Sequence, residues 1–242
     1  MGHAAPDALM TWATFPATPW WFVALLAVAG AGVGEVLRRR LATGGYRLDD
    51  ETGPHPRVSS RVVPVALALL WGLLAWRFGP LSEWALSPAY LAFAFVAVAL
   101  AWIDADVHRL PRGLTRPAYP LLVAQLALAS LASGDWEALR RAAIAGAVLW
   151  AIYFVLALVA ALLGSGFGYG DVTLAGLVGL ATGYVSVSTT LVASYAAFIL
   201  SGVYGLARLV LRRGSRKDDI AFGPWMLLGL LISLVVQVRP LF

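Results

Sequence analysis

Long apolar segments constrain the fold of this chain of 242 residues more than any other feature of its sequence. A helix needs roughly 20 residues to cross the hydrocarbon core of a bilayer, and segments of about this length recur along the chain. We place them at residues 18–37, 62–78, 86–104, 118–133, 142–163, 171–187, 189–211 and 222–238. Hydrophobic residues make up 60% of the chain and charged residues 13%, which is far more apolar than a soluble domain. The sequence therefore predicts an all-α polytopic membrane protein, a single bundle of about eight transmembrane helices without a soluble domain.

The basic residues predict how this bundle is oriented. Of the 18 basic residues, 14 lie on one side of the membrane, in or beside residues 38–61, 109–116 and 208–217. The positive-inside rule assigns that side to the cytoplasm and both chain termini to the exterior. The loops at residues 38–61, 105–117, 164–170 and 212–221 should then be cytoplasmic. Because orientation explains the net charge of +5, we expect a multi-pass protein of the inner (plasma) membrane with lipid as a partner and no nucleic acid.

The N-terminal region and the absence of cysteine set two further limits. The first apolar segment has no basic region before it and is longer than the apolar core of a signal peptide, so we expect no cleavable signal peptide. We divide the chain into residues 1–60, an N-terminal span with its cytoplasmic loop, and residues 61–242, the main membrane domain. The chain contains no cysteine, which excludes disulfide bonds and thiolate metal ligands.

Small residues recur every four positions in the sixth apolar segment. They are Ala175, Gly179 and Gly183. Residues of this size at this spacing let the backbone of a second helix approach closely. We therefore expect this segment to pack tightly against another span.

Two aspartates stand at the predicted cytoplasmic ends of apolar segments. Asp104 ends a span that runs inward, and Asp171 begins a span that runs outward after the glycine-rich turn at residues 166–170. An ionisable residue at the edge of a span is costly and is a candidate functional residue. The simpler interpretation of Asp171 is an N-cap, since Asp is favoured there. The two aspartates are 67 residues apart in sequence, yet the topology puts them on the same membrane face.

The residues that follow Asp104 have less certain roles. Asp106 lies two residues later, about 200° around a helix, so the two carboxylates should not share one face. Asp106 and His108 can be read as parts of a solvated loop beside Arg109, although Asp106 could instead bind a basic substrate segment. Pro111 should break any continuing helix.

Two facing carboxylates suit one kind of chemistry. Held close together they cannot both ionise, so one keeps its proton. The ionised carboxylate can then act as a general base on a water molecule, while the protonated one donates a hydrogen bond to the scissile carbonyl. This is the chemistry of aspartic proteases, which use neither metal nor cofactor.

The motifs around both aspartates resemble those of the bacterial type IV prepilin leader peptidases, which belong to the Gly-x-Gly-Asp class of intramembrane aspartic proteases. Residues 103–111 are similar to the first-aspartate motif of that family, and Gly168-Tyr169-Gly170-Asp171 is similar to the second. Residues 220–224, Ile-Ala-Phe-Gly-Pro, resemble the Pro-Phe-Gly-Pro element that enters the last span of the family. The resemblance covers residues 60–238 well and the first 60 residues poorly.

The resemblance implies an activity and a set of site residues. Asp104 and Asp171 would be the catalytic pair, and the substrate would bind near Gly168, Gly170, Asp106 and Pro111. The substrates of the family are type IV prepilins or pseudopilins, which have a short basic leader ending in Gly and then a hydrophobic helix with Glu at its fifth position. Cleavage follows the Gly on the cytoplasmic side, which agrees with the orientation derived from the loop charges.

The chain also departs from the family pattern. Bacterial members usually carry four cysteines in the first cytoplasmic loop and often methylate the new N-terminus with S-adenosylmethionine. Here residues 38–61 contain no cysteine, so we expect no structural zinc, no cofactor and no methyltransferase activity of the chain itself. Thr173 stands where the family usually has Lys, and Arg112 stands where it usually has Asp after the motif proline.

Two other functions remain as alternatives. A protease like presenilin or signal peptide peptidase pairs its Gly-x-Gly-Asp with Tyr-Asp inside the membrane, whereas here Ile103 precedes an interfacial Asp104. A small transporter would use Asp104 and Asp171 as a proton or cation site and would cleave nothing. A nucleotide-binding loop at residues 164–170 is disfavoured because no strand precedes it and no Lys-Ser/Thr follows it. The sequence leaves open the identity of the prepilin, the oligomeric state and the role of Asp106.

Overall fold

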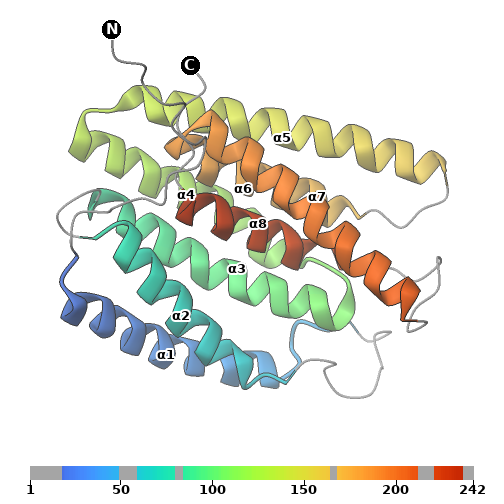
Figure 1. Cartoon of the computed structure of the whole chain (residues 1–242), viewed down its shortest axis with the longest axis horizontal. Coiled ribbons are helices and arrows are strands. Elements are labelled where there is room, and N and C mark those ends of the chain that lie inside the picture. Colours follow the sequence, from blue (N-terminus) through green and yellow to red (C-terminus); the bar gives the residue numbers. More distant parts are fainter. Residues whose placement is uncertain (1–17, 49–58, 80–83, 164–167, 212–220, 237–242) are drawn as a thin grey trace, which may run out of the picture.

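The computed structural model describes residues 18–48, 59–79, 84–163, 168–211 and 221–236, and within these ranges it contains helices and no strand (Figure 1). The elements are α1 (Trp20–Ala42), α2 (Val62–Arg77), η1 (Trp84–Leu86), α3 (Ser87–Val107), α4 (Arg112–Ser133), α5 (Trp136–Leu162), α6 (Tyr169–Val185), α7 (Val187–Val210) and α8 (Gly223–Val235). Each α-helix overlaps one of the predicted apolar segments. The all-α fold of a polytopic membrane protein is therefore confirmed.

The described helices differ in how they could meet a bilayer. α1, α3 together with η1, α5 and α7 are long and apolar enough to cross a membrane. α2 and α8 are apolar but shorter. α6 is the most enclosed helix, because nearly every side chain from Val172 to Tyr184 is buried. α1, α5 and α7 are thus largely exposed apolar helices, whereas α3 and α6 are mostly buried in the bundle.

Two helices begin earlier than the apolar pattern predicted. α4 starts at Arg112 rather than at 118, directly after Pro111, whose extended backbone (φ −69°, ψ 126°) makes it the N-cap. α5 starts at Trp136 rather than at 142, because the Asp135 carboxylate accepts a hydrogen bond of 2.9 Å from the backbone N–H of Ala138. The pattern marks only the apolar part of a span, and both helices continue past it into polar sequence.

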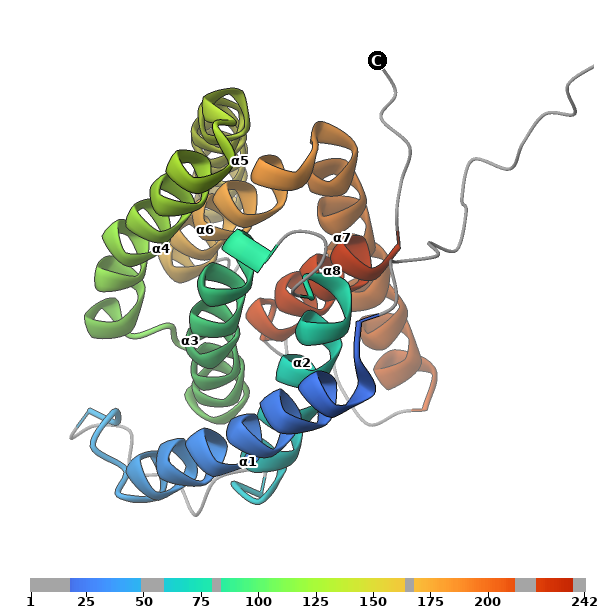
Figure 2. The same ribbon diagram turned by 90° about the vertical axis from the view of Figure 1, so that its left-hand side faces the viewer.

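The predicted close packing of the sixth segment is confirmed, and its partner is α5. A Cβ atom at Gly179 would lie 2.6 Å from the carbonyl oxygen of Ala145. A Cβ atom at Gly183 would lie 2.4 Å from the Cβ of Ala145. Around this pair, α6 also packs against α4, α7 and α8, as the end-on view in Figure 2 shows. This central position fixes the N-terminus of α6, where Asp171 lies.

At the end of the bundle away from Asp104 and Asp171, arginine side chains donate hydrogen bonds to the C-terminal carbonyls of neighbouring helices. Nε of Arg77, at the end of α2, donates to the carbonyl of Leu234 at the end of α8 over 3.1 Å. Arg141, near the start of α5, donates to the carbonyls of Gly183 and Tyr184 at the end of α6 over 2.9 and 2.7 Å. These guanidinium groups satisfy C-terminal carbonyls that no helical N–H can reach.

Candidate active site

Asp104 lies in the last turn of α3 and is held by the first residue of α8. Its side chain is buried, and Oδ2 accepts a hydrogen bond of 3.1 Å from the backbone N–H of Gly223. The free N–H groups at a helix N-terminus are well suited to a carboxylate. A Cβ atom at residue 223 would lie 2.8 Å from Oδ2 of Asp104, so any other residue there would displace the carboxylate or α8.

Asp171 lies in the first turn of α6 and is not its N-cap. The N-cap is Gly168, in an extended conformation (φ −81°, ψ 146°), and the backbone N–H of Asp171 donates to the carbonyl of Gly168 over 3.1 Å. Asp171 is therefore not the N-cap residue, although its carboxylate interacts with the backbone of Gly168 at the start of the helix. Its carboxylate turns back over the start of the helix, with Oδ2 3.8 Å from the point where a Cβ of residue 168 would stand.

Both aspartates line one cavity of about 440 Å³ at the shared end of α3 and α6. The cavity is lined by Leu48, Asp104, His108, Arg109, Leu110, Arg112, Thr115, Gly168, Tyr169, Gly170, Asp171 and Thr173. The predicted glycine-rich turn thus forms part of the wall, although its residues 166 and 167 lie outside the described residues.

The connection between α3 and α4 holds the start of α6 in place. A Cβ atom at Gly170 would lie 2.9 Å from the Cβ of Leu110, so glycine is needed where this connection crosses α6. Farther along α4, the hydroxyl of Tyr119 donates to the carbonyl of Thr173 over 2.7 Å. Pro111 is buried between two lining residues as the N-cap of α4. These contacts bring two segments that are remote in sequence to the same cavity.

Asp106 points away from this cavity and is not solvated. It is 8% exposed, and its Oδ2 accepts hydrogen bonds from the Tyr46 hydroxyl (2.6 Å) and from Nη2 of Arg47 (2.7 Å). The solvated-loop interpretation is therefore wrong for Asp106, because the segment after α1 folds over the inner end of α3. His108, by contrast, is exposed, as that interpretation predicted. A role for Asp106 in substrate binding stays a prediction, and its carboxylate already has two partners within the chain.

The segment after α1 forms a cover beside the cavity. The ring of Tyr46 packs edge-on against Trp102 with 5.6 Å between centroids, and its carbonyl accepts a hydrogen bond of 2.9 Å from Nη2 of Arg109. Burial and the hydrogen bond to Asp106 raise the pKa of Tyr46 to about 12, so its hydroxyl remains a donor at any physiological pH. Leu48, two residues after Tyr46, lines the cavity.

The two departures from the family pattern both face the cavity. Arg112 and Thr173 are among its lining residues. The Thr173 hydroxyl donates to the carbonyl of Tyr169 over 3.0 Å, within its own helix. Both aspartates line the same cavity beside these two residues.

Several residues near the aspartates were not predicted from the sequence to belong to the site. In the sequence, only the Phe-Gly-Pro element pointed to Gly223. Tyr153 is buried in α5, and its hydroxyl is close enough to Asp171 to respond to that charge. A single tyrosine in an apolar helix was its only signal. No sequence feature pointed to Tyr46 and Arg47, because a basic loop does not show which of its residues will pack against another helix.

The described residues offer little to bind a metal ion. No group of three or more His, Asp or Glu side chains among them is placed to hold one. The chain has no cysteine to supply thiolates. The absence of zinc stays a prediction that elemental analysis can test.

Comparisons with known proteins agree with the motifs. Residues 91–206 match the type IV leader peptidase family. Proteins described as prepilin leader peptidase/N-methyltransferase are 30% identical over 174 residues in Pseudomonas aeruginosa (72% of this chain, 57% of that protein) and 33% identical over 177 residues in Pseudomonas putida (70% and 57%). One from Aeromonas salmonicida is 29% identical over 180 residues (73% and 54%).

The chain thus spans somewhat more than half the length of the curated relatives it matches. No solved structure matches it significantly. The matched region contains both aspartates and the helices α4, α5 and α6 that frame them. These matches confirm the resemblance carried by the aspartate motifs: over residues 91–206, the chain belongs to the type IV leader peptidase family.

Proposed function

We propose that this chain is an intramembrane aspartyl endopeptidase that removes the basic leader peptide from type IV prepilins or pseudopilins. The observation that carries the proposal is that Asp104 and Asp171, from two different helices, line one cavity. Cleavage would follow the Gly that ends the leader. The names of the relatives support this substrate class.

The two carboxylates would divide the work of peptide hydrolysis. Two acids held close together in one cavity would share a proton, so that one is ionised while the other is neutral. The ionised carboxylate takes a proton from water as the water attacks the scissile carbonyl carbon. The neutral carboxyl donates its proton toward the carbonyl oxygen and stabilises the charge that develops there. The Gly223 N–H, at 3.1 Å, would keep the Asp104 carboxylate in one orientation throughout.

The position of the cavity suits an interfacial cleavage site. A peptide within a helix has its backbone groups bonded internally, so the scissile segment must unwind before water can attack. The Gly that ends the leader is a poor helix former and lowers the cost of unwinding. A cavity at the end of the bundle also needs no long hydrated channel through the membrane.

The charge pattern supports a cytoplasmic position for this end of the bundle. Arg109 and Arg112 line the cavity itself, and they belong to the basic set that the positive-inside rule keeps on the cytoplasmic side. The protein would then be a multi-pass protein of the inner membrane, with its active site at the cytoplasmic face.

Mass spectrometry of a prepilin co-expressed with the chain tests the proposal. We expect the mature product to begin directly after the Gly of the leader, without a methyl group on its new N-terminus. A prepilin that stays intact beside the wild-type chain would contradict a peptidase and favour a transporter. A cut inside the apolar segment would instead favour a protease like presenilin.

A further inference from the structure

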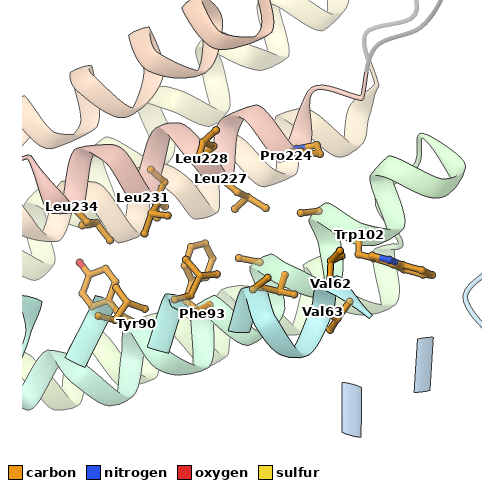
Figure 3. A pocket seen from close by; sticks show the side chains of 18 of the residues that line it. Val62, Val63, Tyr90, Phe93, Trp102, Pro224, Leu227, Leu228, Leu231 and Leu234 are labelled. Carbon is orange, nitrogen blue, oxygen red and sulfur yellow. The ribbon is translucent and has the colours of Figure 1, made fainter. Parts of the chain in front are cut away.

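An apolar groove runs between α2, α3 and α8, separate from the cavity that holds the two aspartates. Its volume is about 320 Å³, and Figure 3 shows apolar side chains from all three helices along its length. α3 forms its floor, because α3 packs against both α2 and α8. The tyrosine hydroxyl in the lining, that of Tyr90, already donates to the carbonyl of Ala181 over 2.6 Å. The groove therefore offers apolar contact within the membrane.

The inner end of this groove meets the Asp104 site. Trp102, Ala105 and Pro224 line that end. Trp102 and Ala105 flank Asp104 along α3, and Pro224 directly follows Gly223, whose N–H binds the Asp104 carboxylate. A segment lying in the groove would thus leave it beside the candidate catalytic residue.

The floor of the groove has the form of a helix-packing surface. Ala94, Ala97, Ala101 and Ala105 line it at intervals of three or four residues, so they share one face of α3. Small residues at this spacing let the backbone of a second helix come close. From Tyr90 to Ala105 the floor extends about 22 Å at a rise of about 1.5 Å per residue, which is most of the thickness of a bilayer core.

The inner end also holds a buried donor that lacks an acceptor. Trp102 is 4% exposed, and its Nε1–H has no hydrogen-bond partner among the described residues. A buried donor without an acceptor costs free energy that a bound ligand can recover. The Trp102 ring turns away from α8 toward Tyr46, so this donor lies just past the end of the groove (Figure 3). An unwound peptide segment that leaves the groove there has a free carbonyl at each residue, whereas a hydrocarbon chain has no acceptor.

We propose that this groove binds the apolar helix of a membrane-anchored protein substrate and leads the unwound segment at its end to Asp104 and Asp171. The assignment rests on the proposed peptidase function and deepens it, because it names the surface that selects the substrate. The occupant is a peptide helix rather than lipid: it matches the small-residue floor, the length of the groove and the free indole N–H.

Disulfide cross-linking tests the groove directly, because the chain has no native cysteine. The probe is a full-length prepilin with one cysteine in its apolar segment, mixed in membranes with chains that carry Leu231→Cys in the groove. The control is Ile199→Cys on α7, which is 63% exposed and does not line the groove. We expect the Leu231→Cys chain to cross-link at least tenfold more than the control. Equal yields from the two chains would overturn the proposal.

A filled groove supplies the second test. Ala97→Trp should reduce cleavage of the full-length prepilin at least tenfold, and it should leave unchanged the cleavage of a short peptide that lacks the apolar segment. The exposed Ala143→Trp on α5 should cleave both substrates normally. Normal cleavage of the full-length prepilin by Ala97→Trp would show that the groove holds only lipid. Cross-linking of the prepilin to the Leu231→Cys chain, together with no cleavage by the wild-type chain, would contradict the peptidase function and leave the groove assignment standing.

Discussion

The backbone N–H of Gly223 donates a hydrogen bond of 3.1 Å to Oδ2 of Asp104, which joins the start of α8 to the end of α3. The two residues are 119 positions apart in the chain. A side chain at residue 223 would force the Asp104 carboxylate or α8 to shift, because a Cβ atom there would lie 2.8 Å from that oxygen. The last helix therefore acts on the site through its backbone, and the requirement for glycine at this position can be tested.

Gly223→Ala should reduce prepilin cleavage by about tenfold, equivalent to about 1.4 kcal/mol in the barrier. The added methyl group must push the Asp104 carboxylate out of its orientation or move α8 away from α3. Steady-state cleavage of a purified prepilin measures the effect. Gly32→Ala, on α1 with nothing within 4 Å of the new Cβ, is the matched control and should behave as wild type. Equal rates for both variants would show that the contact with Asp104 does not matter.

Asp106→Asn should cost stability more than activity. Asp106 faces Tyr46 and Arg47 rather than the cavity, so cleavage should fall by less than about tenfold, or ~1.4 kcal/mol. Loss of the charged partner of Arg47 should destabilise the chain by about 1–3 kcal/mol. Thermal unfolding in detergent, together with Arg47→Ala and the double variant, isolates the pair. Additive losses in that double-mutant cycle would mean that the ion pair is not coupled.

Gly179→Ala should loosen the contact between α5 and α6. Its new Cβ atom would lie 2.6 Å from a backbone oxygen, that of Ala145, which cannot move without shifting α5. Overpacking of this kind costs about 1–3 kcal/mol. We expect a lower Tm than for Gly202→Ala on α7, where nothing lies within 4 Å of the new Cβ. A Gly179→Ala chain as stable as Gly202→Ala would contradict close packing of the two helices.

Much of the fold follows from periodic features that a sequence displays. Apolar length marked every helix, and the spacing of Gly179 and Gly183 marked a packed face. The starts of α4 and α5 were missed, because helices extend beyond the apolar residues into polar sequence that carries no such signal. Pro111 and Asp135 set those starts through backbone conformation and capping, which depend on single residues.

The candidate site was less predictable than the fold. Asp104 and Asp171 were found because a carboxylate at the edge of an apolar span stands out. Contacts between remote segments could not be recognised in the sequence. Tyr46 and Arg47 contact Asp106 only because the chain folds the segment after α1 against the end of α3. For the same reason the burial of Asp106 could not be read from the sequence, because the polar residues His108 and Arg109 follow directly after the end of its helix. A sequence can identify a residue that is costly to place at the edge of a span, whereas the partners of that residue depend on how the helices pack.

Single cysteines test the proposed orientation in this cysteine-free chain. Gly113→Cys, at the exposed start of α4 near the cavity, should react with a membrane-impermeant maleimide only after the membrane is opened. Ala132→Cys, exposed at the opposite end of the same helix, should react in intact cells. A cysteine at Ser215, which lies outside the described residues, should behave like the one at Gly113. Labelling of Gly113→Cys in intact cells would contradict the proposed topology.

The central claim is that Asp104 and Asp171 together hydrolyse the leader, and the most direct measurement is the cleavage rate of a purified prepilin by the two single variants. Asp104→Asn and Asp171→Asn should each lose at least about 100-fold in rate, since each variant removes one partner of the acid–base pair. Both variants should keep a Tm close to that of the wild type. Near-normal cleavage by Asp104→Asn, with Asp106→Asn inactive, would contradict the account.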